Sequence, residues 1–214
     1  MNTLYDIICF DVDSTLVECE GLDWLAEQKG VGKKVKKLTE LSMNGEVPIE
    51  KVFGNKLDII RPTLADLYKV GEYYCSQITE GAEETIDALH QLGIDIWLVS
   101  GSFTPALLPL AQRLNIDSSH IHANEVYLST SGDYNGINLN CSLTKANGKA
   151  ECAKKIGKGK RTAFIGDSVT DLATKPVVKT FIGYGGVSQR KRVKDEAEFF
   201  IKFRSIKPLL ALVY

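Results

Sequence analysis

The sequence lacks the features of a disulfide-stapled, secreted or membrane-spanning protein. Its five cysteines are odd in number and form no CxxC pair, so we expect reduced thiols rather than a disulfide framework. No apolar run approaches the ~18 residues of a membrane span, and the first residues lack the basic stretch and cleavable apolar segment of a signal peptide. We therefore expect a soluble, cytoplasmic protein with no membrane partner.

An excess of charge of either sign is also missing. The 26 basic and 27 acidic residues give a formal net charge of -1, which offers no broad field for nucleic acid, so no nucleic-acid partner is expected. We interpret the basic runs at 33–37 and 190–192 as solvated helix faces. Only three histidines occur, with no third ligand at metal spacing, so a histidine metal site is not expected.

Short apolar runs alternate with helical patterns along the 214 residues. The runs at 7–10, 94–99, 162–165 and 180–182 are typical of buried strands. Strands that alternate with helices predict an α/β protein with a Rossmann-like parallel sheet. A β-hairpin is expected from two further runs, 125–128 and 134–139, with Gly132 in the turn between them.

The interval between the first two strands is too long for one crossover helix. It contains four helical patterns, at about 22–26, 31–41, 48–60 and 63–74. Pro62 ends the third pattern, and Thr63 with Asp66 resembles a capping sequence for the fourth. We therefore expect a small helical cap at residues 17–80, inserted into an α/β core formed by residues 1–16 and 81–214.

Two carboxylates, Asp11 and Asp13, follow the first strand. Ligand sites of parallel sheets lie beyond the carboxyl ends of the strands. At a spacing of two, both side chains should leave on the same side and repel each other unless a cation or a proton intervenes. Mg²⁺ suits such a site because it takes oxygen ligands, commonly one or two carboxylates and a substrate phosphate. A calcium site and simple loop capping stay open as alternatives.

A second acidic motif, Gly166-Asp167 through Asp171, follows the strand at 162–165. Asp167 would complete an oxygen-rich magnesium site with Asp11, and Asp171 would support that site from behind. The alternative interpretation is that both acids of this motif only cap the next helix.

Two further motifs supply candidate phosphate ligands. Ser100-Gly101 follows the second strand, and a hydroxyl with exposed amides at a helix N-terminus suits phosphate oxygens, although such sequences are also common in turns. Lys149 would offset phosphate charge in a transition state, with Lys145 as a nearby alternative. A surface role is the alternative for either lysine.

Together these motifs resemble those of the haloacid dehalogenase superfamily, and within it the phosphoserine phosphatases. The resemblance extends to residues 20–21, 43–48 and 182–186. It implies the haloacid dehalogenase fold and a Mg²⁺-dependent phosphomonoesterase in serine biosynthesis, which acts through an aspartyl phosphate on a small phosphorylated metabolite, L-phosphoserine first. Asp13 disfavours the dehalogenases and transport ATPases of the superfamily, which lack an acid at that position.

The resemblance also implies a role for each motif residue. Asp11 is the nucleophile, and Asp13 protonates the leaving oxygen and later deprotonates the attacking water. The metal ligands are Asp11, the backbone carbonyl of Asp13, and Asp167, with Asp171 behind them. The phosphate ligands are Ser100, Gly101 and Lys149. A noncatalytic phosphate-binding protein would require the loss of one motif acid, and all four acids are present.

The substrate-binding residues implied by the resemblance are Glu20, Met43 and Lys56. Glu20 would face a substrate ammonium group. Lys56 stands where relatives carry an arginine for the substrate carboxylate, and a lysine there provides a point charge without a bidentate fork, or only a snorkelling stem. Ser102 stands where relatives commonly carry a second glycine. Another small phosphate ester, or transfer to an acceptor such as homoserine, therefore stays open, as does the choice between a monomer and a homodimer.

Overall fold

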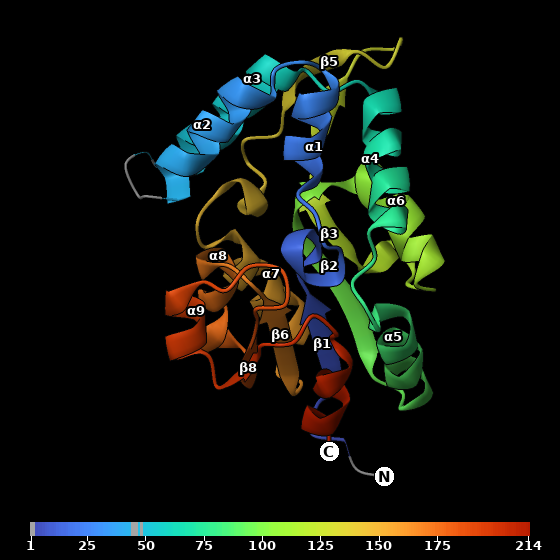
Figure 1. Ribbon diagram of the computed structural model, residues 1–214. Helices are drawn as coiled ribbons and strands as arrows, with labels where there is room; N and C mark the ends of the chain where they lie inside the picture. The colour runs from blue at the N-terminus through green and yellow to red at the C-terminus, as the bar shows by residue number, and fades with distance from the viewer. Residues whose placement is uncertain (1–2, 44–46, 48) are drawn as a thin grey trace.

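The structure is a computed structural model that describes residues 3–43, 47 and 49–214 (Figure 1), without the side chains of residues 40, 42, 43, 49 and 50. Six strands form one sheet in the order β3-β2-β1-β6-β7-β8, and each neighbouring pair is parallel. This confirms the expected parallel α/β sheet. The strands are β1 (Ile7–Phe10), β2 (Asp95–Phe103), β3 (Ile121–Asn124), β6 (Thr162–Gly166), β7 (Thr180–Tyr184) and β8 (Phe199–Ile201).

The two faces of the sheet bury separate apolar layers because successive strand residues point to opposite sides. Ile8 and Phe10 belong to a large buried cluster that includes residues of α5 (Ala82–Gln91) and α6 (Thr104–Arg113). Ile7 and Cys9 belong to a second cluster that includes residues of α7 (Gly148–Gly157). In Figure 1, α5 and α6 lie to one side of the sheet, and α7, α8 (Val169–Leu172) and α9 (Lys191–Glu196) lie to the other.

The strand order places the two acidic motifs beside each other. β2 and β3 lie on one side of β1, whereas β6, β7 and β8 lie on the other. In sheets of this kind a crevice opens beyond the carboxyl ends of the strands, where the order changes direction. Asp11 follows β1 and Asp167 follows β6, and these two strands are hydrogen-bonded neighbours. Both acids therefore emerge at the same crevice.

Among the described residues, four α-helices lie between β1 and α5 in the chain and stand over the carboxyl end of the sheet in Figure 1. Thr63 and Asp66 form the reciprocal capping hydrogen bonds expected at the start of the fourth helix. We call these helices the helical group; the division into a cap at 17–80 and a core stays a prediction. Its members are α1 (Gly21–Gln28), α2 (Gly32–Met43), α3 (Ile49–Ile60) and α4 (Leu64–Ser76).

Two chain segments connect the helical group to the sheet, and they run beside each other. Val17 and Ile78 form an antiparallel β-bridge. Next to it, the Thr79 hydroxyl donates a hydrogen bond of 2.7 Å to the Thr15 carbonyl oxygen. The entering and leaving segments are thus joined by hydrogen bonds.

The expected hairpin is confirmed as an antiparallel pair, β4 (Val126–Leu128) and β5 (Tyr134–Ile137). Gly132 in its turn has a φ of 84°, a left-handed conformation that glycine adopts without strain. The hairpin contacts the start of α4 through a 2.8 Å hydrogen bond from the Leu64 N–H to the Gly132 carbonyl oxygen.

The other expectations from composition concern cysteines and membrane spans. All five cysteines are free, as expected. Among the helices of the described ranges, none has both the length and the apolar character needed to cross a membrane.

α4 packs tightly against α6 at Gly71. A Cβ at this position would lie 2.6 Å from Pro109 Cγ and 2.8 Å from the Ala106 carbonyl oxygen. Either helix would have to shift to accept it. Glycine is therefore required at this contact, although it weakens a helix by about 0.5–1 kcal/mol relative to alanine.

We expect Gly71→Ala to lower the free energy of unfolding, although alanine favours helix. The added methyl group overpacks the α4–α6 contact, which costs about 1–3 kcal/mol. Gly54→Ala in α3 is the matched control, because a Cβ there meets nothing within 4 Å, and it should stabilise by up to about 1 kcal/mol. Denaturant midpoints of the two variants and the parent measure both effects. A stabilised Gly71→Ala would contradict the close approach.

Candidate active site

The loop after β1 directs Asp11 and Asp13 to different partners. β1 ends at Phe10, and a tight turn at Val12–Leu16 follows, in which Ser14 adopts a left-handed φ of 55°. Asp11 and Asp13 thus lie after the strand rather than on it, so the strand period does not set their directions, although both line the same cavity. Asp11 Oδ1 accepts a 2.8 Å hydrogen bond from the Val12 N–H, whereas Asp13 Oδ1 accepts one of 2.7 Å from the Gly21 N–H.

Three buried carboxylates gather at the crevice. Oxygen atoms of Asp11, Asp167 and Asp171 all lie within 4.8 Å of one another. Burial, followed by the charge of Asp171, raises the pKa of Asp11 well above its usual range and raises the pKa of Asp167 to about 7. The cluster therefore holds more negative charge than its surroundings readily accommodate.

Two basic side chains offset part of this charge. Lys149 Nζ lies 2.6 Å from both Asp11 Oδ1 and Asp171 Oδ1, and Arg190 Nε lies 3.2 Å from Asp167 Oδ2. Burial opposes the charged form of Lys149, but the carboxylates of Asp11 and Asp171 outweigh it and raise the pKa of this lysine. Lys149 thus stays an ammonium ion inside the protein.

The donor atoms of the cluster suit a hard divalent cation. All three side chains offer carboxylate oxygens, which Mg²⁺ prefers. Lys149 and Arg190 do not offset all the charge of the three carboxylates, so negative charge remains for a cation to neutralise. The residues present therefore fit Mg²⁺, the ion expected from the sequence.

The two carboxylate oxygens of Asp171 have different partners, and one of them caps the next helix, which is one of the interpretations that the sequence left open. Its Oδ2 accepts hydrogen bonds from the N–H and hydroxyl of Ser168 at the start of α8, a capping box. Its Oδ1 pairs with Lys149. Gly166 makes this packing feasible, because any Cβ there would collide with the Asp171 side chain.

The second strand extends further than expected, which changes the setting of Ser100. β2 continues to Phe103, so Ser100 lies within a strand rather than at a helix N-terminus. Ser100 is fully buried, and its hydroxyl oxygen accepts a 3.0 Å hydrogen bond from the Ser102 N–H. Gly101 and Ser102 line the adjoining cavity, together with Lys145.

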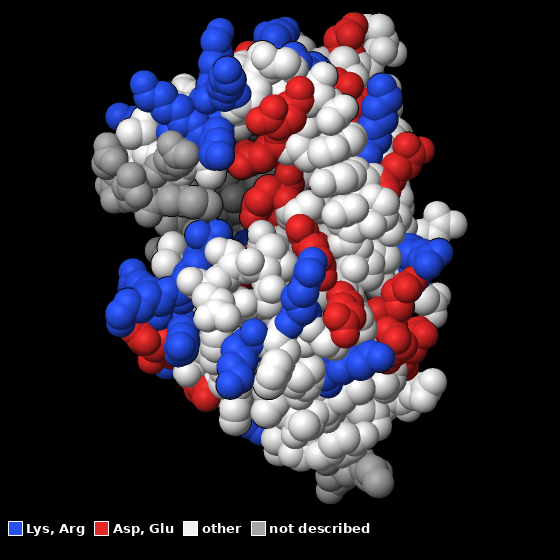
Figure 2. Space-filling view, viewed as in Figure 1, with Lys and Arg blue, Asp and Glu red and all other residues white. Residues whose placement is uncertain are grey.

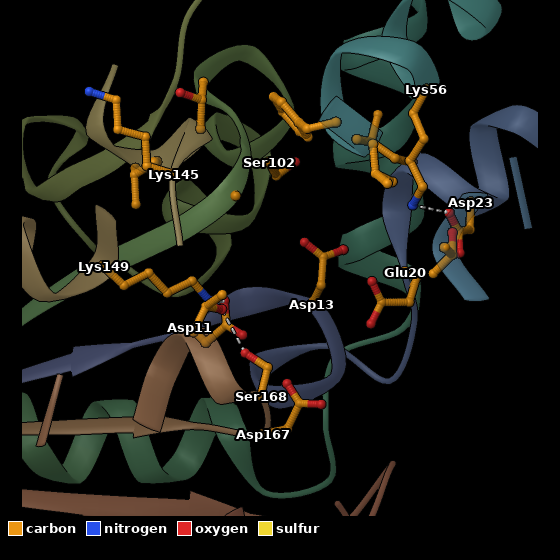
Figure 3. A pocket seen from close by; sticks show the side chains of 18 of the residues that line it. Asp11, Asp13, Glu20, Asp23, Lys56, Ser102, Lys145, Lys149, Asp167 and Ser168 are labelled. Atoms are coloured by element: carbon orange, nitrogen blue, oxygen red, sulfur yellow. Dashed lines mark hydrogen bonds and ion pairs between the residues drawn. The ribbon is translucent and has the colours of Figure 1, made fainter. Parts of the chain in front are cut away.

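A cavity of about 250 Å³ lies between the sheet end and the helical group (Figure 3), a size that suits a small molecule. On the face seen in Figure 2, basic side chains gather over α2 and α9, and acidic side chains lie beside the recess between them. The charged residues that line the cavity are Asp11, Asp13, Glu20, Asp23, Lys56, Lys145, Lys149, Asp167 and Arg190.

The helical group contributes charges of both signs to this cavity. Lys56 Nζ pairs with Asp23 Oδ1 at 3.0 Å, and Glu20 Oε1 accepts a 2.7 Å hydrogen bond from the Ser14 hydroxyl. Enclosure by the protein, followed by the charge of Asp13, raises the pKa of Glu20; its solvent contact through the cavity moderates this rise. The side chain of Met43 lies outside the described part of the structure.

Sequence reasoning missed two residues beside the site. Arg190 was assigned to a solvated helix face, but it precedes α9 and pairs with Asp167. Lys191 and Arg192 are exposed as expected. Tyr74 in α4 is fully buried, and its hydroxyl reaches Asp13. A tyrosine in an apolar helix pattern is indistinguishable from an ordinary core residue, so no sequence signal marked it.

Comparison with known proteins agrees with this geometry. A model of the haloacid dehalogenase-like hydrolases matches residues 5–174. The chloroplastic phosphoserine phosphatase of Arabidopsis thaliana is 37% identical over 207 residues, which are 94% of this chain and 70% of the relative. A substrate-bound phosphoserine phosphatase complex has a TM-score of 0.84 at 27% identity. A phospho-aspartyl intermediate analogue of phosphoserine phosphatase has a TM-score of 0.82 at 28% identity. Both comparisons cover 98% of this chain and 99% of the other.

We expect Mg²⁺ to raise the melting temperature by relieving repulsion among the clustered carboxylates. At a concentration about 100-fold above the Kd the gain is about 2.7 kcal/mol, or roughly 5–10 °C for a chain of this size. Asp167→Asn should remove most of the Mg²⁺-dependent rise, whereas Asp87→Asn on the exposed face of α5 should retain it. Thermal melts with and without Mg²⁺ measure the rise. An unchanged rise in Asp167→Asn would exclude Asp167 as a ligand.

Proposed function

The chain belongs to the haloacid dehalogenase-like hydrolase family, and we propose that it hydrolyses L-phosphoserine to L-serine and phosphate. The observation that carries this proposal is the content of one cavity. Asp11 and Lys149 lie at its sheet end, and Glu20 and Lys56 lie on its helical side. The first pair suits a phosphate group, and the second pair suits the ammonium and carboxylate groups of an amino acid. Relatives and similar solved structures are named as phosphoserine phosphatases.

The first half of the reaction transfers the phosphoryl group to Asp11. Its Oδ1 is oriented by the Val12 N–H and by Lys149, which leaves Oδ2 to attack phosphorus. The bond between phosphorus and the serine oxygen breaks, and its electron pair stays on that oxygen. Asp13 donates a proton there, so that neutral serine leaves. Lys149 offsets the negative charge on the phosphoryl oxygens.

The second half restores the enzyme. Asp13, now a carboxylate, takes a proton from a water molecule as that water attacks the aspartyl phosphate. The bond between phosphorus and the Asp11 oxygen breaks, and inorganic phosphate and the Asp11 carboxylate result. Mg²⁺ held by Asp11, the Asp13 backbone carbonyl and Asp167 would neutralise charge on the phosphoryl oxygens when bound. Asp171 supports the site by holding Lys149 at 2.6 Å.

Substrate recognition is assigned to the helical side of the cavity. Glu20 pairs with the substrate ammonium, and Lys56 offers a single point of contact to the carboxylate. Asp23 occupies one of the three donors of the Lys56 ammonium and holds it at the cavity wall. Met43 is assigned to substrate binding on the resemblance alone. Gly101 and the buried Ser100 are assigned to support the phosphate group, with Ser100 acting through the backbone it fixes.

The Lys56–Asp23 pair also favours a second candidate. Because Asp23 shares the charge of Lys56, the cavity has less net attraction for a carboxylate than an unpaired cation would provide. A small phosphate ester without that carboxylate, or transfer of the phosphoryl group to homoserine, is therefore the alternative. The cytoplasmic location and the monomeric or homodimeric state stay predictions; the free cysteines are consistent with a reducing compartment.

Phosphoserine should be the best substrate among small phosphomonoesters, and Asp11→Asn should lose turnover roughly 10⁴-fold or more, as loss of a nucleophile does elsewhere. Phosphate release is measured for phosphoserine, ethyl phosphate and phosphoethanolamine, with homoserine added as a trial acceptor. Acid-quenched enzyme from labelled phosphoserine should carry covalent label, and Asp11→Asn should carry none. Equal turnover of unrelated esters would refute the phosphoserine assignment, and label on Asp11→Asn would refute the nucleophile.

Glu20→Gln should lower kcat/KM for phosphoserine but leave it nearly unchanged for 3-phosphoglycerate, which carries a hydroxyl in place of the ammonium. Because the pKa of Glu20 is raised, its carboxylate forms only as the pH rises through that pKa. The preference of the parent for phosphoserine should therefore grow from mildly acidic to mildly alkaline pH, and that of Glu20→Gln should stay flat. A parallel rise in both proteins would show that Glu20 is not the ammonium ligand.

A further inference from the structure

A buried tyrosine lies directly behind the proton-transferring acid. Tyr74 is 0% exposed, and its Oη lies 2.7 Å from Asp13 Oδ1 and 3.1 Å from Ser102 Oγ. It comes from the last turn of α4, whereas Asp13 follows β1 and Ser102 belongs to β2. Three separate parts of the chain thus meet through hydroxyl and carboxylate oxygens.

The direction of these hydrogen bonds follows from the number of protons. A phenol carries one proton, and Asp13 Oδ1 accepts it together with the Gly21 N–H, whether Asp13 is ionised or carries its own proton on Oδ2. Tyr74 Oη is also the donor toward Ser102 Oγ, at a longer 3.1 Å, so its one proton is shared, with Asp13 Oδ1 at 2.7 Å as the nearer acceptor. Ser102 is itself held, because its N–H donates to the buried Ser100 hydroxyl. The Tyr74 hydroxyl is thus held between two acceptors, Asp13 Oδ1 and the fixed Ser102 Oγ.

Both donors to the Asp13 side chain bind the same oxygen. The Gly21 N–H and the Tyr74 hydroxyl each lie 2.7 Å from Oδ1. Oδ2 is therefore the oxygen left to exchange a proton with the substrate. Figure 3 shows the Asp13 side chain extending into the cavity between Ser102 and Glu20.

The surrounding sequence is adapted to this contact. A Cβ on Gly21 would collide with the Tyr74 ring, so a glycine at the start of α1 lets the ring approach. One turn before Tyr74, Gly71 brings α4 against α6. Ser102 places its hydroxyl oxygen 3.1 Å from the phenol oxygen.

We propose that Tyr74 is a positioning residue for Asp13, which holds Oδ1 so that Oδ2 faces the leaving oxygen, and that Ser102 steadies Tyr74 in this task. The inference rests on the proposed function, because it assigns a helper to the acid of that reaction. Its effect depends on the leaving group. An alkoxide such as that of serine needs a proton to depart, whereas acetate does not, so Tyr74 matters for a serine ester and hardly for acetyl phosphate.

Tyr74→Phe tests this by removing the hydroxyl and keeping the ring. The kcat/KM reports the steps up to cleavage of the phosphorus–oxygen bond. For phosphoserine we expect kcat/KM to fall about 10–100-fold. This loss is part of the roughly 10²–10⁴-fold rate enhancement that a positioned acid supplies. The loss should lie in kcat with KM nearly unchanged, because Tyr74 does not line the cavity. The kcat/KM for acetyl phosphate should change less than about 3-fold, as no proton transfer is needed.

Two further variants complete the design. Tyr73→Phe is the matched control, since Tyr73 stacks on Trp24 at 4.4 Å and should leave both substrates unaffected. Ser102→Ala should lower kcat/KM for phosphoserine but not for acetyl phosphate, by a smaller factor than Tyr74→Phe. It tests the positioning role if Tyr74→Phe does not fold.

The outcomes separate the positioning role from a structural one. Equal losses on phosphoserine and acetyl phosphate, or no loss on either, overturn the proposal. If the parent prefers another alkyl phosphate, the proposed function fails, but the same comparison made with that ester still decides the role of Tyr74.

Discussion

The ion pairs of one buried lysine hold the catalytic end of this structure together. Lys149 lies 2.6 Å from both Asp11 and Asp171, and without it the protein would have to bury mutually repelling carboxylates. Breaking a buried pair from one side typically costs about 3–5 kcal/mol because the other charge is left uncompensated. The positions of Asp11, of α8 behind Asp171, and of α7 that carries Lys149 are therefore coupled. An ammonium ion already fixed beside the nucleophile also needs no rearrangement when phosphoryl charge develops.

The two sides of the cavity divide the chemistry between them. The sheet end supplies rigid groups, because Asp11 and Asp167 follow buried neighbouring strands. The helical group supplies Glu20, Lys56 and Asp23, whose charges suit the amino-acid part of a substrate. Tyr74 belongs to the helical group in sequence but acts on the sheet side, on Asp13.

Local patterns predicted what local forces determine. The strand at 7–10, the capping of α4 by Thr63, and the hairpin turn at Gly132 were predictable because propensity and turn chemistry act within a few residues. The grouping of Asp11 with Asp167 was predictable because neighbouring parallel strands end at one edge. The different hydrogen-bond partners of Asp11 and Asp13 were not, because β1 ends at Phe10 and both acids lie in the turn that follows. The place of Arg190 depends on a partner 23 residues away in the chain, which no local pattern records.

The hydrogen-bonded connection between the helical group and the sheet has a consequence for how such an enzyme diversifies. Val17 and Ile78 are paired, so the segment between them begins and ends at one place. The residues between these two positions can therefore change in number or sequence without altering the register of the strands. Substitutions at positions such as Lys56 can then retune what enters the cavity while the bond-breaking groups keep their geometry. Gly21 and Tyr74 of the same segment are the exceptions, because their hydrogen bonds to Asp13 tie them to the bond-breaking groups.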